Sequence, residues 1–388
     1  MNTGMGMRSR NIGEEGTHGT ETTCNRRRLL TGVGALSVSG VAGCVSTNGE
    51  EETIEGSGDI GGETLNVMIN AGRFAEMFER SVIPNAEEKY DLTINADIAF
   101  TGEQTSEITA NPDNPPDAVM LGRDGIYELA QQDLLEPLDE HTDTVTHYED
   151  VHDHLKWDDD HGVAWSLGEA SPLVVRGDEH WDHTPDTWDE VFRESETISL
   201  VPFDWAEGPQ VLMMAAAIAT DDDFSSADLD IDAGFEYLEE HVEPKVTNIW
   251  QNEQQLLQLV GNEATDSFVP WIDYIDPELL REENYEMVRR PDPTGIPYAQ
   301  CVAVTSNSDN KEAALAYINE ALDPDLQEEA SEYMGQGVTN ANAEMAEVAE
   351  DIGAPSAEEF EELEYQDFEM MWENRSEWAE RWSALFGG

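Results

Sequence analysis

Apolar and polar positions follow the periods of strands and helices from residue 64 onward. Short apolar runs predict strands at 64–69, 92–96, 117–121, 163–165, 171–175, 198–201, 267–269 and 301–305. Helical spacing predicts helices at 73–88, 126–130, 208–219, 233–242, 310–321 and 324–334, a helix capped by Thr187, and an aromatic docking helix within 358–385. Strands that alternate with helices predict an α/β fold with mainly parallel sheets.

The N-terminal segment has a different pattern. Three consecutive arginines, 26–28, precede a short apolar stretch at 29–42, and small residues then lead to Cys44. This order is typical of a twin-arginine export signal that ends in a lipoprotein cleavage site. The apolar stretch is too short for a membrane-spanning helix, which needs about 20 apolar residues. We predict a signal peptide at 1–43, lipidation of Cys44, and a flexible acidic tether at 44–62.

Acidic residues outnumber basic ones along the whole chain. The sequence holds 85 Asp and Glu against 19 Lys and Arg, a net charge of −66. Such a surface repels itself at ordinary salt, whereas at 1 M salt the Debye length falls to about 3 Å and the repulsion is largely screened. We therefore predict an extreme halophile, an archaeon, as the source. Nucleic acid is excluded as a partner, because binding phosphates needs a basic face.

Cysteine usage and length limit how the protein is held together. Cys24 lies in the predicted signal, Cys44 is the predicted lipid anchor, and Cys301 stands alone, so no pair remains for a disulfide. The residues beyond the tether are enough for two domains that are stabilised by packing alone.

Four stretches of the chain resemble one family of proteins. They are 116–121 with 134–138, 162–165 with 168–169, the Trp-centred segment 188–192, and 310–319 with 324–325. Together they resemble the solute-binding proteins of ABC importers, in particular the two-lobed (type 2) spermidine/putrescine-binding kind. The resemblance extends over nearly all of residues 64–388, and with the N-terminal segment it describes a haloarchaeal lipoprotein.

This resemblance implies a periplasmic-binding-protein-like fold with two α/β lobes, each a mainly parallel sheet flanked by helices. Lobe 1 would comprise 63–173 plus 301–388, and lobe 2 would comprise 174–300. The lobes would close around a small polar solute in the cleft between them. The family further implies a monomer without cofactor, lipid-anchored on the extracellular face of the membrane, that delivers its solute to ABC permease subunits.

In this fold the loops that follow the strands line the cleft. Asp204 and Glu207 match the D-x-x-E spacing with which polyamine binders hold ammonium groups, and Trp271 with Asp273 resembles another acidic and aromatic pair of those proteins. Carboxylates bind ammonium by charge-assisted hydrogen bonds, and indole rings add cation–π attraction. The candidate ligand-binding residues are Arg73, Arg123, Asp124, Trp165, Glu169, Asp204, Glu207, Trp250, Trp271, Asp273, Tyr298 and Gln300.

Two loops depart from the family pattern. Asn70–Arg73 replaces an early Trp-Thr-Glu-Tyr stretch, and Gly122 and Asp124 replace a Ser and a Tyr, with Arg123 between them. Two arginines near helix N-termini would favour an anionic or zwitterionic solute instead. Simpler interpretations stay open: surface carboxylates for Asp204 and Glu207, and local salt bridges for both arginines.

Histidines and enzyme motifs supply the remaining alternatives. Seven of the nine histidines fall between His141 and His183, where a Zn²⁺ or Fe site is conceivable, although the loose spacing favours a polar loop without metal. No Gly-x-Ser-x-Gly, Walker or dinucleotide motif is present in the sequence, and Cys301 has no neighbouring His, so a secreted hydrolase is the weaker alternative class. Asn374-Arg375-Ser376 is a possible glycosylation site.

A polyamine or related organic cation is the first expectation for the solute. An anionic or zwitterionic solute or a metal ion is the alternative.

Overall fold

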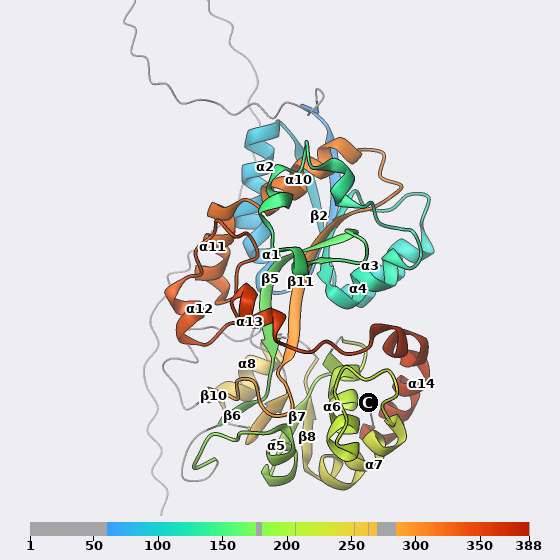
Figure 1. Ribbon diagram of the computed structural model, residues 1–388, viewed down its shortest axis with the longest axis vertical. Coiled ribbons are helices and arrows are strands. Elements are labelled where there is room, and N and C mark those ends of the chain that lie inside the picture. Colours follow the sequence, from blue (N-terminus) through green and yellow to red (C-terminus); the bar gives the residue numbers. More distant parts are fainter. Residues whose placement is uncertain are drawn as a thin grey trace, which may run out of the picture. The chain divides into compact units, whose positions relative to one another are not determined.

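Two β-sheets, each covered by helices, form the body of the protein in the computed structural model (Figure 1). The structure describes residues 60–175, 181–205, 207–251, 253–262, 264–269 and 285–387, which belong to one compact unit. The predicted signal peptide, Cys44 and nearly all of the predicted tether lie outside these residues. Among the described residues, no helix is both long enough and apolar enough to cross a membrane.

The first sheet has the order β2-β1-β3-β11-β5-β4. Its strands are β1 (Thr64–Ile69), β2 (Thr93–Ile98), β3 (Ala118–Gly122), β4 (Lys156–Trp157), β5 (Gly162–Ala170) and β11 (Ile296–Val304). Strands β1, β2 and β3 are parallel, and β11, β5 and β4 pair antiparallel to their neighbours. Every residue of β3, β5 and β11 is buried, as expected for central strands with helices on both faces.

The second sheet has the order β10-β6-β9-β7-β8. Its strands are β6 (Leu173–Val175), β7 (Ile198–Leu200), β8 (Val246–Ile249), β9 (Ser267–Val269) and β10 (Tyr285–Met287). Strand β7 is parallel to both β8 and β9, whereas β6 is antiparallel to β9 and β10. Each sheet is thus mixed: its βα portion is parallel as expected, and the strands that connect the two sheets supply the antiparallel pairs.

Most of the helices lie where they were predicted. The helices are α1 (Arg73–Met77), a π-helical turn η1 (Phe78–Val82), α2 (Ile83–Tyr90), α3 (Thr101–Ala110), α4 (Arg123–Ala130), α5 (Trp188–Glu194), α6 (Glu207–Thr220), α7 (Ile231–His241), α8 (Glu253–Gly261), α10 (Lys311–Ala321), α11 (Pro324–Met334), α12 (Glu347–Asp351), α13 (Ala357–Glu361) and α14 (Phe368–Phe386). Helices α8 and α12 were not predicted, and the helix expected at 73–88 is interrupted by the π-helical turn. Short 3₁₀ turns are η2 (Leu138–His141), η3 (Thr146–Asp150), η4 (Asp153–Leu155) and η5 (Glu243–Lys245). Thr187 caps α5 by accepting a hydrogen bond from the Glu190 backbone N–H at 2.9 Å, as its sequence position predicts.

The chain passes between the two sheets at the ends of β5 and β11, which lie side by side (Figure 1). Residues 171–172 join β5 to β6, and residues 288–295 join β10 to β11. Glu169 ties these two links together: its Oε1 accepts hydrogen bonds from the Ser171 hydroxyl and, at 2.7 Å, from the Arg290 backbone N–H. Glu169 is fully buried, so its carboxylate links the two connecting segments from within the core.

The C-terminal aromatic segment forms two helices where one docking helix was expected. Helix α13 ends at Glu361, and the Asp367 carboxylate starts α14 by accepting from the Met370 N–H at 2.6 Å. Helix α14 contacts α4 beside the first sheet and α6 beside the second (Figure 1). Its buried residues are Phe368, Met371, Trp378 and Trp382.

Candidate functional site

A small pocket of about 40 Å³, partly open to solvent, lies where loops from both sheets meet. The first sheet supplies the residues that follow the carboxyl ends of β1, β2 and β3, which is where parallel α/β sheets place their ligands. The second sheet supplies the loop between β7 and α6, and α14 adds one side chain. We call this the acidic pocket; it is lined by Asn70, Phe100, Thr101, Gly102, Gly122, Asp124, Asp204, Trp205, Glu207, Tyr298 and Arg375.

Asp124 is the carboxylate of the first-sheet wall. It lies in the first turn of α4, and its side chain is only 8 % exposed. A Cβ at Gly122 would lie 2.7 Å from Asp124 Oδ1, so glycine is needed there for the carboxylate to fold back over the strand end. Burial raises the pKa of Asp124 above its usual value, although Arg375 and the Gly125 N–H lower it in part.

The second-sheet wall is the loop that joins β7 to α6. Asp204 is exposed, and Glu207, the first residue of α6, is 4 % exposed. Trp205 packs edge-on against the buried Trp250, with ring centroids 4.9 Å apart, and its other side contacts Phe100 of the first-sheet wall at 5.1 Å. The D-x-x-E pair of the sequence therefore lines the acidic pocket together with an aromatic contact that joins its two walls.

Tyr298 lines the acidic pocket from β11, one of the two strands that cross between the sheets. Its side chain is nearly buried, at 7 % exposure. Gln300, two residues further along the same strand, is fully buried and donates a hydrogen bond to the Tyr298 hydroxyl. Gln300 is not among the lining residues, and it orients Tyr298 from behind.

The two arginines that suggested an anionic solute do not line the acidic pocket. The Arg73 guanidinium lies over the Tyr333 ring at 4.4 Å and donates to the Tyr333 carbonyl. Arg123 forms an ion pair with Asp158 at 2.5 Å, and its guanidinium lies close to the rings of Trp157 and Phe368. Both side chains thus contact distant parts of the fold.

Three further predicted residues lie behind the pocket or away from it. Trp165 is in the core, where its indole N–H donates to the Ala321 carbonyl at 2.8 Å and its ring packs against Phe78. Trp250 supports Trp205, and Glu169 holds the crossing between the sheets. Trp271 and Asp273 lie outside the described residues.

Arg375 is a lining residue that the sequence did not indicate. It lies on α14, and its Nη2 donates to the Asp204 carbonyl at 2.6 Å. Its Nη1 lies 3.8 Å from Asp124 Oδ2. In sequence Arg375 is 171 residues from Asp204, and helical spacing marks α14 only as a docking helix. The preceding Asn374 of the possible glycosylation motif lies within the helix, and its side chain donates to the Met370 carbonyl.

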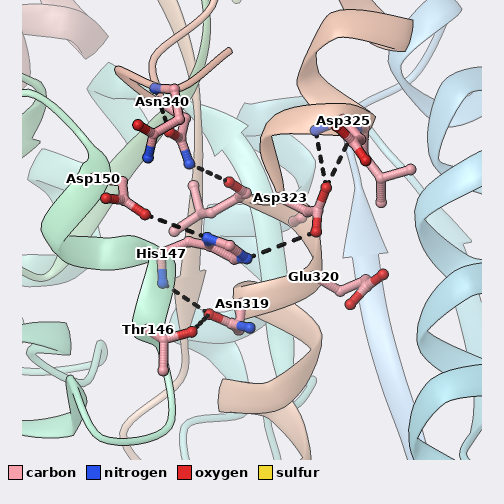
Figure 2. Close-up of polar contacts among 12 residues, drawn as sticks. Thr146, His147, Asp150, Asn319, Glu320, Asp323, Asp325 and Asn340 are labelled. Atoms are coloured by element: carbon pink, nitrogen blue, oxygen red, sulfur yellow. Dashed lines mark hydrogen bonds and ion pairs between the residues drawn. The ribbon is translucent and has the colours of Figure 1, made fainter. Parts of the chain in front are cut away.

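In the histidine-rich region, His147 takes part in a polar network that includes Asp150, Asn319 and Asp323. Figure 2 shows the His147 imidazole between two carboxylates: Nδ1 is 3.5 Å from Asp150 and Nε2 is 3.7 Å from Asp323. The His147 backbone N–H donates to the Asn319 side chain at 3.0 Å, which ties η3 to α10. Within the described ranges, no group of three or more His, Cys, Asp or Glu residues could hold a metal ion.

Comparisons with known proteins identify the family. A model of the family "Bacterial extracellular solute-binding protein" matches residues 81–357. Among solved structures, an ABC transporter protein of Clostridium perfringens has 17% identity and a TM-score of 0.66, covering 82% of this chain and 99% of its own. The periplasmic binding protein AfuA of Actinobacillus pleuropneumoniae, solved with fructose-6-phosphate, has 16% identity and a TM-score of 0.65, covering 84% and 99%. AgtB of A. tumefaciens R10, solved with agropinic acid, has 15% identity and a TM-score of 0.64, with the same coverage.

The structures share the fold of this chain at low identity, while a search of curated proteins finds no match. The family model covers well over half of the 388 residues and includes the described strands of both sheets except β1. The chain therefore belongs to the bacterial extracellular solute-binding protein family.

Proposed function

We propose that this protein is the solute receptor of an ABC importer and that it captures a small organic cation of the polyamine kind in the acidic pocket. The observation that carries the proposal is the charge of the lining: its described residues include three acidic ones, Asp124, Asp204 and Glu207, and one basic one, Arg375. The surroundings of Asp124 and Glu207 separate them from the many surface acids of the chain. Asp124 and Glu207 are largely buried, beside three aromatic side chains.

A cationic solute suits this lining for two physical reasons. Burial of Asp124 disfavours its charged form, so a cation that binds beside it offsets part of that cost. The rings of Phe100, Trp205 and Tyr298 cover methylene groups and attract an ammonium group through their faces. Hydrogen bonds from ammonium to carboxylate then fix its position.

The alternative, an anionic or zwitterionic solute bound by Arg73 and Arg123, receives less support. Both guanidinium groups already contact other parts of the fold, Arg73 at Tyr333 and Arg123 at Asp158. Structural neighbours were solved with agropinic acid and with fructose-6-phosphate, so the fold itself accepts different solutes. The charge of the pocket lining supports a cationic solute over an anionic one.

The remaining parts of the proposal concern location and delivery. Twin-arginine export, lipid attachment at Cys44 and the tether at 44–62 would hold the receptor beside its permease, outside the cell. The crossing strands β5 and β11 would act as the hinge of two lobes, 63–173 with 301–388 and 174–300, and α14 would span them. A monomer is enough for this task, because both pocket walls belong to one chain.

Thermal unfolding at multimolar NaCl tests the solute class. Putrescine at 100 times its Kd is expected to add about 2.7 kcal/mol to the free energy of unfolding, and 4-carbon dicarboxylates are expected to add nothing. Glu207→Gln should lower putrescine affinity at least tenfold, whereas Asp232→Asn, an exposed carboxylate paired with Arg381, should leave it unchanged. A shift with the dicarboxylate and none with putrescine would reject the cationic proposal. Solute recovered unaltered after incubation separates a receptor from a hydrolase.

A further inference from the structure

Among the described residues that line the acidic pocket, Arg375 alone has a cationic side chain. It also lines an adjoining recess of about 640 Å³, where the other lining residues include Glu103 and Glu128. The described lining of the pocket and the recess thus holds five acidic residues and this one guanidinium; the acidic residues are Asp124, Asp204, Glu207, Glu103 and Glu128.

The guanidinium bridges the two walls of the pocket. Nη2 donates to the Asp204 carbonyl at 2.6 Å on the second-sheet wall, and Nη1 lies 3.8 Å from Asp124 Oδ2 on the first-sheet wall. It thus lies where the ammonium group of a solute would meet the same two walls. The Arg375 side chain is 25 % exposed, so it has room to leave this position.

Helix α14 holds Arg375 at the boundary from both of its ends. At the first end, Phe368 stacks on Tyr127 of α4 with ring centroids 5.8 Å apart. At the other end, Trp382 packs against Phe203, the residue before Asp204, at 5.4 Å. The position of the Arg375 backbone is therefore fixed by packing that does not depend on its charge.

Arg375 also acts as the counter-ion of the buried carboxyls. Its charge lowers the pKa of Asp124 and of Glu128, in opposition to the burial that raises both. Without this positive charge, the effects that raise the two pKa values, burial and the repulsion between the carboxylates, would be less opposed than before. The cationic group of a bound solute would lower the two pKa values again, as the guanidinium does.

We infer that the Arg375 guanidinium occupies the position of the solute's cationic group when no solute is bound, and that it makes the receptor selective for solutes with two or more positive charges. This inference rests on the proposed function of the acidic pocket. A monoamine merely exchanges one cation for another, so its net gain is small. A diamine replaces the guanidinium at Asp124 and Asp204 and places its second ammonium near Glu103 and Glu128 of the recess.

Calorimetry with putrescine and with butylamine, at multimolar NaCl, tests this selectivity. Arg375→Gln is expected to raise butylamine affinity at least tenfold and so to reduce the ratio between the two amines, and Arg375→Lys should keep the wild-type ratio. Arg381→Gln is the matched control, because Arg381 lies on the same helix, pairs with Asp232 at 2.8 Å and does not line the pocket. An unchanged ratio in Arg375→Gln would overturn the inference. So would wild-type binding of 4-aminobutanoate that this variant loses, because Arg375 would then contact a carboxylate of the solute.

A measurement without solute separates this inference from the proposed function. If the wild-type protein binds neither amine, the proposed function fails. The role of Arg375 as counter-ion is then tested by the pKa of Asp124, which NMR follows through its carboxyl carbon. That pKa should rise further in Arg375→Gln and stay unchanged in Arg381→Gln. An Asp124 pKa that does not move in Arg375→Gln would overturn the role of Arg375 as counter-ion.

Discussion

Replacing Trp205 with alanine should weaken both the fold and the pocket. Among the described residues, Trp205 contacts the rings of Phe100 at 5.1 Å and Trp250 at 4.9 Å. Each aromatic pair contributes about 0.5–1.5 kcal/mol beyond its buried area, so losing both costs about 1–3 kcal/mol. The half-buried indole adds a transfer cost, and we expect a total loss of about 3 kcal/mol in the free energy of unfolding.

Denaturant unfolding at multimolar NaCl measures this loss. Trp372→Ala is the matched control, because Trp372 is 42% exposed and, within the described ranges, contacts one ring, that of Tyr127 at 6.5 Å. It should cost less than about 1 kcal/mol. Trp205→Phe should recover much of the stability while it weakens the cation–π contribution to solute binding. A Trp205→Ala variant within about 0.5 kcal/mol of the wild type, or one no less stable than Trp372→Ala, would refute the role of this ring between the walls.

Three other outcomes follow from the titratable groups. Affinity for putrescine should fall as pH drops through the pKa of Asp124, because a protonated carboxyl no longer attracts a cation. Burial raises this pKa, and a flat affinity profile from pH 7 to pH 4 would contradict the prediction. The pKa of His183 should be about 8 by NMR, because Asp182 and then Glu190 stabilise its charged form, and Glu190→Gln should lower it; titration near 6.5 in the wild type would contradict this. Cys301 is fully buried, and burial raises the pKa of its thiol, so a thiol reagent should label it only in unfolded protein; fast labelling of the native protein would contradict this.

Local sequence signals were sufficient for most of the elements. The continuous apolar runs of β3 and β11 predict buried strands, and Pro324 marks the first turn of α11, where its missing N–H has no cost. Strand β8 (Val246–Ile249) carries no such signal, because an edge strand without a buried residue lacks a continuous apolar run. The break between α13 and α14 depends on the Asp367 cap, which competes with a helical spacing that continues on both sides.

The candidate site was predictable only as far as strand order allows. A residue that follows a parallel strand lies at the carboxyl edge of its sheet, so Asp124 is expected at that edge of the first sheet and Asp204 with Glu207 at that of the second; all three line the acidic pocket. The same rule does not say where a long side chain points. Arg73 and Arg123 lie at that edge as well, but their guanidinium groups reach Tyr333 and Asp158, partners that no local pattern identifies.

The acidic composition creates a problem of selectivity that the carboxylates alone cannot solve. In the molar salt that the net charge of −66 predicts, inorganic cations are abundant, and any cluster of carboxylates attracts them. Charge therefore cannot distinguish an organic ammonium from Na⁺ or K⁺. Apolar surface can, because covering methylene groups with the rings of Phe100, Trp205 and Tyr298 gains about 25 cal/mol per Å² and gives an inorganic ion nothing. The aromatic residues should accordingly set the identity of the solute, while the carboxylates and Arg375 set its charge.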